Sequence, residues 1–276
     1  MATYVFSDVH GHNKPLERLL EKVQPSSEDE VWVLGDMVDR GPDPIGVIRT
    51  CRAIPNVHIL MGNHEDMLLE FFHHPHKPLV TFQWELNGGY TTKEGLGRLT
   101  EHELVDLIDW MENLQLSAHI EVGGRPYLLV HAGIRPLNFS SRSRWSDVTM
   151  DALLRYQHPE DLLWIRDEFW CVPTGFIDEQ GRGPIVIAGH TPVPYVEDLL
   201  GAYEVGVVSD RLARNEEGAC QVMHLGACEA TGGVADRWAI DCGAAGGAGW
   251  GRIGLIRLAD EEHEYQEYYE PILEGE

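Results

Sequence analysis

Six side chains of types that commonly bind metal ions stand directly after short apolar runs typical of strands. They are Asp8, His10, Asp36, Asn63, His131 and His190. Two carboxylates, one amide and three imidazoles offer oxygen and nitrogen donors without sulfur, which suits manganese, iron or zinc. A carboxylate such as Asp36 can bridge two divalent ions about 4 Å apart, and such ions turn bound water into a hydroxide nucleophile. We therefore expect a binuclear site that holds two divalent metal ions, with Mn preferred and Fe or Zn as alternatives.

Basic and acid–base groups close to these ligands in the sequence indicate a phosphorylated substrate. Two divalent ions, two aspartates, a hydroxide and a phosphomonoester together leave about one negative charge unbalanced, which requires cationic side chains. Arg40, four residues after Asp36, and Arg166 can supply guanidinium groups for the phosphate oxygens. We expect His64 to protonate the leaving oxygen and Asp39 to hold its imidazole and raise its pKa.

The ligands are spaced as repeated strand–helix units would space them. Three such units are predicted, with strands at 4–6, 31–34 and 57–61 and helices at 15–23, 44–53 and 65–72. Asp8 and Asp36 are 28 residues apart, and Asp36 and Asn63 are 27 apart, about the length of one unit. Consecutive units build a parallel sheet, so we expect their polar residues to meet at one edge of that sheet.

The rest of the chain predicts an α/β fold that becomes α+β-like towards the C-terminus. Further strands are expected at 126–130, 184–188, 238–240 and 253–258, and residues 79–116 are expected to be mainly helical. We predict a single domain over residues 1–276. It would carry an insertion at 195–237, where the pattern is weak, and an acidic C-terminal tail at 261–276.

Composition and charge exclude several classes of protein. The chain has 21 basic and 45 acidic residues and a formal net charge of −24, so a nucleic-acid surface binder is not expected. Uninterrupted apolar runs long enough to cross a membrane are missing, and the N-terminus does not read as an export signal. The five cysteines are widely spaced and form neither a disulfide framework nor a zinc ribbon. We expect a cytoplasmic protein with no membrane partner.

Five short motifs occur in order along the chain. They are Ser7-Asp8-Val9-His10-Gly11, Gly35-Asp36-Met37-Val38-Asp39-Arg40-Gly41, Gly62-Asn63-His64-Glu65, Val130-His131-Ala132-Gly133 and Ala188-Gly189-His190-Thr191. This series resembles the motifs of the calcineurin-like metallophosphoesterases. The Asp39-Arg40 pair and the Asn-His-Glu triplet are similar to those of the PPP family of serine/threonine protein phosphatases, especially its bacterial and phage branch.

The resemblance implies a metallophosphoesterase fold, a mixed β-sandwich flanked by helices, and a role for each matched residue. Asp8, His10 and Asp36 match the ligands of one metal ion. The ligands of the second ion are matched by Asp36, Asn63, His131 and His190. His64 matches the general acid, supported by Asp39, while Arg40 and Arg166 match the phosphate-binding arginines.

The activity implied is that of a metal-dependent hydrolase that attacks a phosphomonoester in line with metal-bound hydroxide. The favoured substrate is a phosphoprotein or phosphopeptide that carries phosphoserine or phosphothreonine, and small phosphoesters would also react. Two alternatives stay open. One is a symmetrical bis(5'-nucleosyl)-tetraphosphatase, which the Gly41-Pro42-Asp43 sequence also resembles. The other is a non-catalytic scaffold or phospho-ligand sensor, against which the complete ligand set argues.

Overall fold

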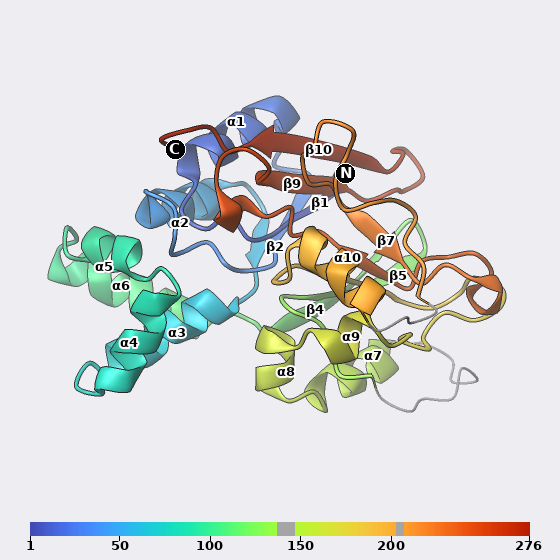
Figure 1. The fold of residues 1–276 in the computed structure, drawn as a ribbon, viewed down its shortest axis with the longest axis horizontal. Helices are drawn as coiled ribbons and strands as arrows, with labels where there is room; N and C mark the ends of the chain where they lie inside the picture. Colours follow the sequence, from blue (N-terminus) through green and yellow to red (C-terminus); the bar gives the residue numbers. More distant parts are fainter. Residues whose placement is uncertain (137–146, 203–206) are drawn as a thin grey trace.

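The structure is a computed structural model that describes residues 1–136, 147–202 and 207–276. Within these residues the strands form two five-stranded sheets, and helices flank them (Figure 1). The strand orders are β10-β9-β1-β2-β3 and β4-β5-β6-β8-β7. Each sheet contains both parallel and antiparallel pairs, so both are mixed.

Parallel strands form the centre and one edge of the first sheet. Its strands are β1 (Thr3–Phe6), β2 (Glu30–Val33), β3 (Val57–Ile59), β9 (Arg252–Arg257) and β10 (Gln266–Pro271). β1, β2 and β3 pair in parallel, with α1 (Asn13–Val23) and α2 (Pro44–Ala53) as the crossovers. β9 and β10 complete the sheet as an antiparallel pair. The C-terminal segment predicted as an acidic tail thus contains an edge strand.

The second sheet carries the other parallel strands. Its members are β4 (Ser117–Val122), β5 (Arg125–Val130), β6 (Ile185–Ala188), β7 (Met223–Leu225) and β8 (Arg237–Ala239). β5, β6 and β8 run parallel to one another, and β4 and β7 are antiparallel at the edges. β7 comes from the segment 195–237 that we predicted as an insertion, of which residues 203–206 lie outside the described residues.

Helices fill the long connections between strands. Between β3 and β4 lie α3 (Asn63–His73), α4 (Pro78–Leu86), α5 (Tyr90–Leu96) and α6 (Glu101–Glu112). Between β5 and β6 lie α7 (Asp147–Arg155), α8 (Pro159–Trp164) and α9 (Asp167–Trp170). α10 (Val193–Ala202) follows β6, and two short 3-10 helices occupy Glu229–Thr231 and Ala244–Gly246. None of the helices in the described residues is both long and apolar enough to cross a membrane.

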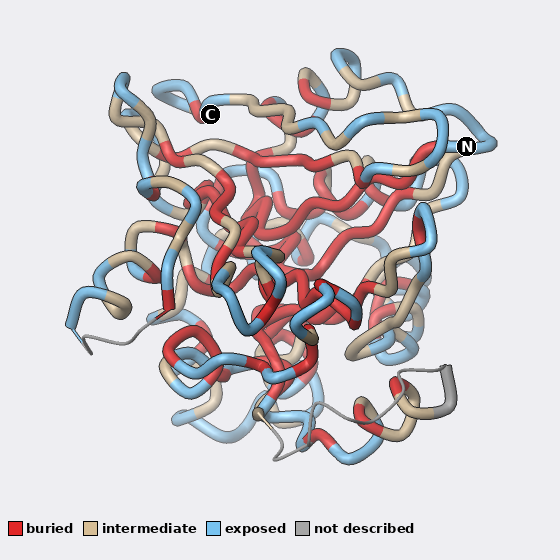
Figure 2. The backbone as a smooth tube through the Cα atoms, turned by 90° about the vertical axis from the view of Figure 1, so that its right-hand side faces the viewer, coloured by how far each residue is buried: buried red, intermediate tan, exposed pale blue. Residues whose placement is uncertain are grey.

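Two apolar cores hold the sheets and helices together. Successive residues of a strand point to opposite faces, and the parallel strands are apolar on both. Val5 of β1 belongs to the core between the sheets, together with Leu128 and Val186 of the second sheet. Its neighbour Phe6 belongs to the core beneath the helices, with Leu16 of α1. Buried backbone is accordingly concentrated in the strands (Figure 2). The predicted mixed β-sandwich flanked by helices is confirmed.

Candidate metal centre and active site

Two sheets, rather than one, deliver the predicted metal ligands. Asp8, Asp36 and Asn63 follow β1, β2 and β3, whose parallel pairing brings their ends to one edge, as the spacing predicts. His131 and His190 follow β5 and β6 of the second sheet. The expectation of a single shared sheet edge is wrong for these two histidines, because the antiparallel strand β4 precedes β5 and a second sheet begins there. The two sheets end at the same place, and each supplies part of the cluster.

Asp8, His10 and Asp36 form one half of this buried cluster. His10 Nε2 lies 3.5 Å from Asp36 Oδ2 and 4.0 Å from Asp8 Oδ1. His10 Nδ1 lies 3.1 Å from the carbonyl oxygen of Val38. Because a carbonyl only accepts hydrogen bonds, Nδ1 carries the proton and Nε2 turns its lone pair towards the two carboxylates. Three acceptors that face one another in this way suit a cation between them.

Asn63, His131 and His190 form the other half around the same aspartate. Asn63 Oδ1 lies 2.9 Å from His131 Nε2 and 2.8 Å from His190 Nδ1. His131 Nε2 is also 3.5 Å from Asp36 Oδ1. His131 Nδ1 donates to the carbonyl oxygen of Leu34 at 2.7 Å, so Nε2 is again a lone pair that faces oxygen atoms.

Asp36 is the residue that the two halves share. Its carboxylate, with His131 and His190, places three ligand atoms within 4.8 Å of one another, and with His10 and His64 it places another three. The second group contains His64, which the sequence predicts as an acid rather than a ligand. His64 Nε2 lies 3.9 Å from Asp36 Oδ2, so this imidazole stands beside the ligand cluster.

The charge states of the cluster fit divalent cations. Burial raises the pKa of Asp8 and of Asp36 well above the usual range, and neighbouring carboxylates raise it further. Burial also lowers the pKa of His10, and lowers that of His131 to about 3, so both imidazoles are neutral. A buried site with neutral imidazoles and carboxylates that repel one another lacks positive charge. Divalent cations would supply it, and the oxygen and nitrogen donors fit Mn, Fe or Zn.

The backbone at the cluster adopts conformations that ordinary residues avoid. Eight non-glycine residues among those described have a positive φ, and six of them belong to the site: Asp8, His10, Asp36, Asp39, Arg40 and His190. Left-handed conformations of this kind are held only where the surrounding structure enforces them, and they concentrate at functional sites. A close backbone approach contributes, since a Cβ on Gly62 would lie 2.2 Å from Asp36 Oδ1.

Glu65 enforces the loop that carries Asp36, a role that sequence reasoning missed. Its fully buried carboxylate accepts hydrogen bonds from the backbone N–H groups of Asp36, Met37 and Gly62, at 2.8, 2.8 and 2.9 Å. It thereby ties the loop after β2 to the start of α3. A glutamate three residues into a helix whose N-cap is Gly62 is a typical capping position, and that was the available signal.

His64 is held by Asp39, and Asp39 by two residues from the helical segment. His64 Nδ1 lies 2.7 Å from Asp39 Oδ2. Trp84 Nε1 donates to the same oxygen at 3.0 Å, and the Thr92 hydroxyl donates to Asp39 Oδ1 at 2.6 Å. The predicted rise in the pKa of His64 is outweighed: burial, the largest cause, and the charges of Arg40 and Arg166 together lower that pKa more than Asp39 raises it. Trp84 and Thr92 carry no recognisable ligand pattern, so their contacts with Asp39 become apparent only in the fold.

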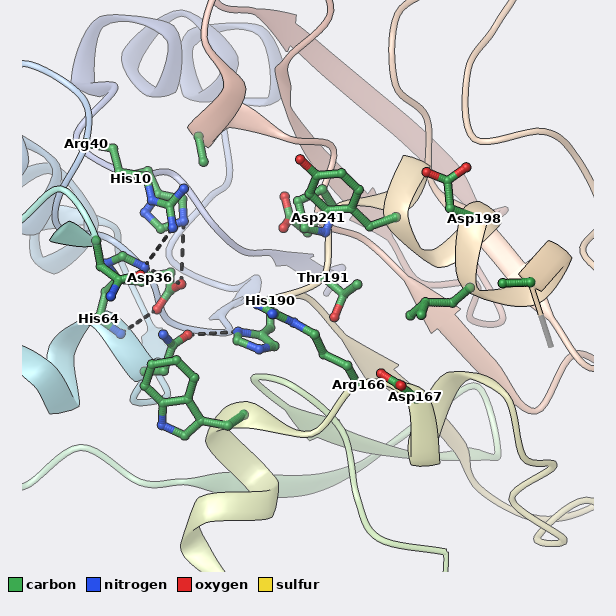
Figure 3. A pocket seen from close by; sticks show the side chains of 18 residues that line it. His10, Asp36, Arg40, His64, Arg166, Asp167, His190, Thr191, Asp198 and Asp241 are labelled. Carbon is green, nitrogen blue, oxygen red and sulfur yellow. Dashed lines mark hydrogen bonds and ion pairs between the residues drawn. The ribbon is translucent and has the colours of Figure 1, made fainter. Parts of the chain in front are cut away.

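Arg40 and Arg166 both line an open cavity of about 420 Å³ beside the cluster (Figure 3). An Arg40 terminal nitrogen lies 3.3 Å from His64 Nε2, and its backbone N–H donates to the Gly88 carbonyl at 3.0 Å. Arg166 comes from the N-cap of α9 and lies beside His190 in Figure 3. The structure thus brings all ten predicted site residues together, around one cavity and in the buried cluster beside it.

A buried arginine fixes the helix that presents Arg166. Arg237 of β8 is fully buried, and one of its terminal nitrogens donates to the carbonyls of Phe169 and Trp170, at 2.6 and 3.2 Å. Its Nε donates to Asp236 at 2.8 Å, so the charge is paired. The carbonyl end of α9 is therefore anchored to the second sheet. No pattern in the sequence indicates this contact.

Several known proteins that are similar in sequence to this chain carry the same name. Symmetrical bis(5'-nucleosyl)-tetraphosphatases are 35% identical over 158 residues in Erwinia tasmaniensis, 30% over 219 in Ectopseudomonas mendocina and 28% over 216 in Acidovorax sp.. These alignments cover 56%, 78% and 78% of this chain, and 50%, 67% and 66% of the relatives. The chain therefore spans about half to two thirds of the length of these relatives.

Solved structures and a family profile agree on the fold. A metallophosphoesterase from Sphaerobacter thermophilus superposes with a TM-score of 0.50 at 19% identity, over 99% of this chain and 90% of that one. A protein serine/threonine phosphatase from Saccharomyces cerevisiae gives 0.50 at 14%, over 100% and 81%. The profile of the calcineurin-like phosphoesterases matches residues 1–217. With the motifs and the sandwich already described, this match means that the chain belongs to the calcineurin-like phosphoesterase family.

Proposed function

We propose that this protein hydrolyses bis(5'-nucleosyl) tetraphosphates symmetrically. Water attacks one of the two central phosphorus atoms, the bond from that phosphorus to the central bridging oxygen breaks, and two nucleoside diphosphates leave. The relatives that share 28–35% identity are named for this activity. They favour it over the phosphoprotein phosphatase activity that the motifs first suggested.

The observation that carries the proposal is a pair of adjoining cavities, of which the first lies beside the cluster. A second cavity of about 330 Å³ shares Asn87 and Trp164 with the first. A substrate with a nucleoside at each end of a phosphate chain needs room on both sides of the point of cleavage. A single phosphorylated side chain does not.

In this proposal the cluster would hold two divalent cations, with manganese preferred because carboxylate and amide oxygens, which suit this ion, make up half of the ligands. Asp8, His10 and Asp36 would hold one of them, and Asp36, Asn63, His131 and His190 the other. When bound, such ions supply Lewis acidity and lower the pKa of water.

The remaining predicted residues would bind the phosphate groups and protonate the leaving oxygen. Arg40 and Arg166 would hold phosphate oxygens with paired N–H groups. His64 would give a proton to the leaving oxygen, and Asp39 would keep its ring in position through the hydrogen bond at 2.7 Å.

The Asp39–His64 pair favours a second candidate, hydrolysis of phosphoserine and phosphothreonine. An alkoxide is a strong base and needs protonation as it leaves, whereas a nucleoside diphosphate leaves as a stable anion. A general acid that is held in position therefore accelerates the hydrolysis of a phosphomonoester more than that of a tetraphosphate. This observation keeps phosphopeptides as substrates to be tested.

One assay separates the two candidates. The purified protein, loaded with manganese, is incubated with diadenosine tetraphosphate and, in parallel, with phosphoserine and phosphothreonine peptides. We expect adenosine diphosphate as the sole nucleotide product of the first reaction, at a higher kcat/KM than phosphate release from peptides. Intact diadenosine tetraphosphate beside rapid peptide dephosphorylation would reverse the order. Asp36→Asn serves as the control for contaminating phosphatases.

A further inference from the structure

The cavity beside the cluster has two chemically different ends. Arg40 lies at the end that contains His10 and His64, and Arg166 lies beside His190, whereas Asp198 of α10 lies away from them (Figure 3). Among the described residues that line the cavity, Arg40 and Arg166 are the only lysines or arginines. Phosphate groups are therefore attracted to one end alone.

One face of α10 lines the other end. Tyr195, Asp198, Leu199 and Ala202 all border the cavity and follow the i, i+3, i+4, i+7 spacing of a single helix face. The opposite face of α10 is anchored, because Val193 and Val196 are fully buried in the core between the sheets. We call the four cavity-lining residues the α10 face.

Trp164 of α8 also borders the cavity, at the end where His190 lies. Its ring meets that of His190 edge to face, with centroids 5.9 Å apart, and it is still 37% exposed. Tyr195 is 59% exposed although it borders the cavity. At the α10 end, Tyr195 is a large aromatic side chain that stays partly open above a concave surface, so a planar ligand can cover it.

We propose that the α10 face is the binding site for a nucleoside of the substrate. The base would pack on the aromatic and aliphatic side chains, because every base has a face that stacks. The Asp198 carboxylate only accepts hydrogen bonds, so it fits the hydroxyls of ribose or an amino group of a base, and it repels phosphate. The inference rests on the proposed function, since it assigns one end of that substrate.

The test compares two inhibitors that share their phosphates. Hydrolysis of p-nitrophenyl phosphate by the manganese-loaded protein is inhibited with adenosine diphosphate or with pyrophosphate. The ratio of the two inhibition constants measures what the nucleoside adds, and a change in turnover cancels from it. We expect the diphosphate nucleotide to bind at least about tenfold more tightly than pyrophosphate in the wild type, the size of a stacking contribution.

Two variants address the α10 face itself. Tyr195→Ala should reduce the preference for adenosine diphosphate by about tenfold. Asp198→Ala should reduce it too, and should strengthen inhibition by pyrophosphate because a repelling charge is gone. Tyr156→Ala is the matched control, since Tyr156 is 82% exposed and does not border the cavity. Thermal unfolding of each variant shows that it is folded.

The outcomes for the inference and for the proposed function are distinct. An unchanged inhibitor ratio in Tyr195→Ala and Asp198→Ala, or a wild type that does not prefer the nucleotide, overturns the nucleoside site even if diadenosine tetraphosphate is cleaved. A wild type that prefers the nucleotide through Tyr195 but leaves diadenosine tetraphosphate intact supports the site and overturns the proposed reaction. Loss of the preference in Tyr156→Ala as well would also count against the site.

Discussion

The floor and the wall of the cavity are built on opposite principles. The floor, which comprises Asp8, His10, Asp36, Asn63, His131 and His190, is buried, joined by short polar contacts and held in strained backbone. The wall, which comprises Trp164, Arg166 and the α10 face, is at least partly exposed and comes from short helices. The strained, desolvated floor tolerates few substitutions, whereas exposed residues of the helical wall can be substituted one at a time. We infer that the floor sets the reaction and the wall selects the substrate.

The floor gives the largest expected effect. Asp36→Asn removes the carboxylate that both halves of the cluster share, so turnover of every phosphoester should fall to the background rate. In the protein stripped of metal the same change should raise Tm by about 2–4 °C, because one of several buried, mutually repelling carboxylates is gone. Metal analysis, turnover and thermal unfolding check this. A variant that keeps two ions and its activity would contradict the shared role of Asp36.

Asp39→Asn tests whether Asp39 supports the general acid His64. The change weakens the hold on His64, so hydrolysis of a phosphoserine peptide should slow by about 10²–10⁴-fold, the usual worth of a general acid. Diadenosine tetraphosphate and p-nitrophenyl phosphate should be affected far less, because their leaving groups are stable anions. The measurement is kcat on the three substrates. Equal losses on all three would show that Asp39 maintains the floor rather than the acid.

The same contrast explains how much the sequence revealed. Asp8, Asp36 and Asn63 could be placed together because each ends a strand of one parallel sheet, and a repeated unit has a fixed length. The second sheet was harder, since its edges β4 and β7 are antiparallel strands with weak patterns, and β7 has only three residues. Trp84 and Glu65 act through contacts that only the folded chain creates. The α10 face was hidden within a segment whose weak periodicity we interpreted as an insertion.

On the wall, Arg166→Ala should act on binding more than on the chemical step. Arg166 is exposed beside His190 at the N-cap of α9, so its loss should raise KM for diadenosine tetraphosphate by about 10–100-fold, the worth of a charged hydrogen bond. The kcat should change less. Arg98→Ala is the matched control, because that side chain is 74% exposed and does not border the cavity. A fall in kcat with unchanged KM would mean that Arg166 acts in the chemical step, as the residues of the floor do.

The smallest expected effect is on stability, at a contact between α1 and β10 that lies outside both the floor and the wall. Arg18 on α1 donates to Glu270 of β10 at 2.7 Å, and the Glu270 side chain is 12% exposed. Burial raises the pKa of Glu270, but hydrogen bonds from Arg18 and Lys22 lower it more, so the net shift is downward. Arg18→Gln should lower the free energy of unfolding by about 1 kcal/mol and leave kcat and KM unchanged.

The pH dependence of this loss follows from the direction of the shift. A carboxylate whose pKa is lowered by folding stabilises the protein above its unfolded pKa of about 4.3, and that stabilisation is lost as pH falls through the folded pKa. The difference between wild type and Arg18→Gln should be full at neutral pH and should vanish as pH falls through the lowered pKa of Glu270. Urea unfolding at a series of pH values measures it. A difference that persists in acid would mean that Arg18 stabilises β10 through groups that do not titrate, such as the Pro271 carbonyl to which it donates at 3.2 Å. A change in kcat would mean that the edge of the first sheet influences the metal cluster.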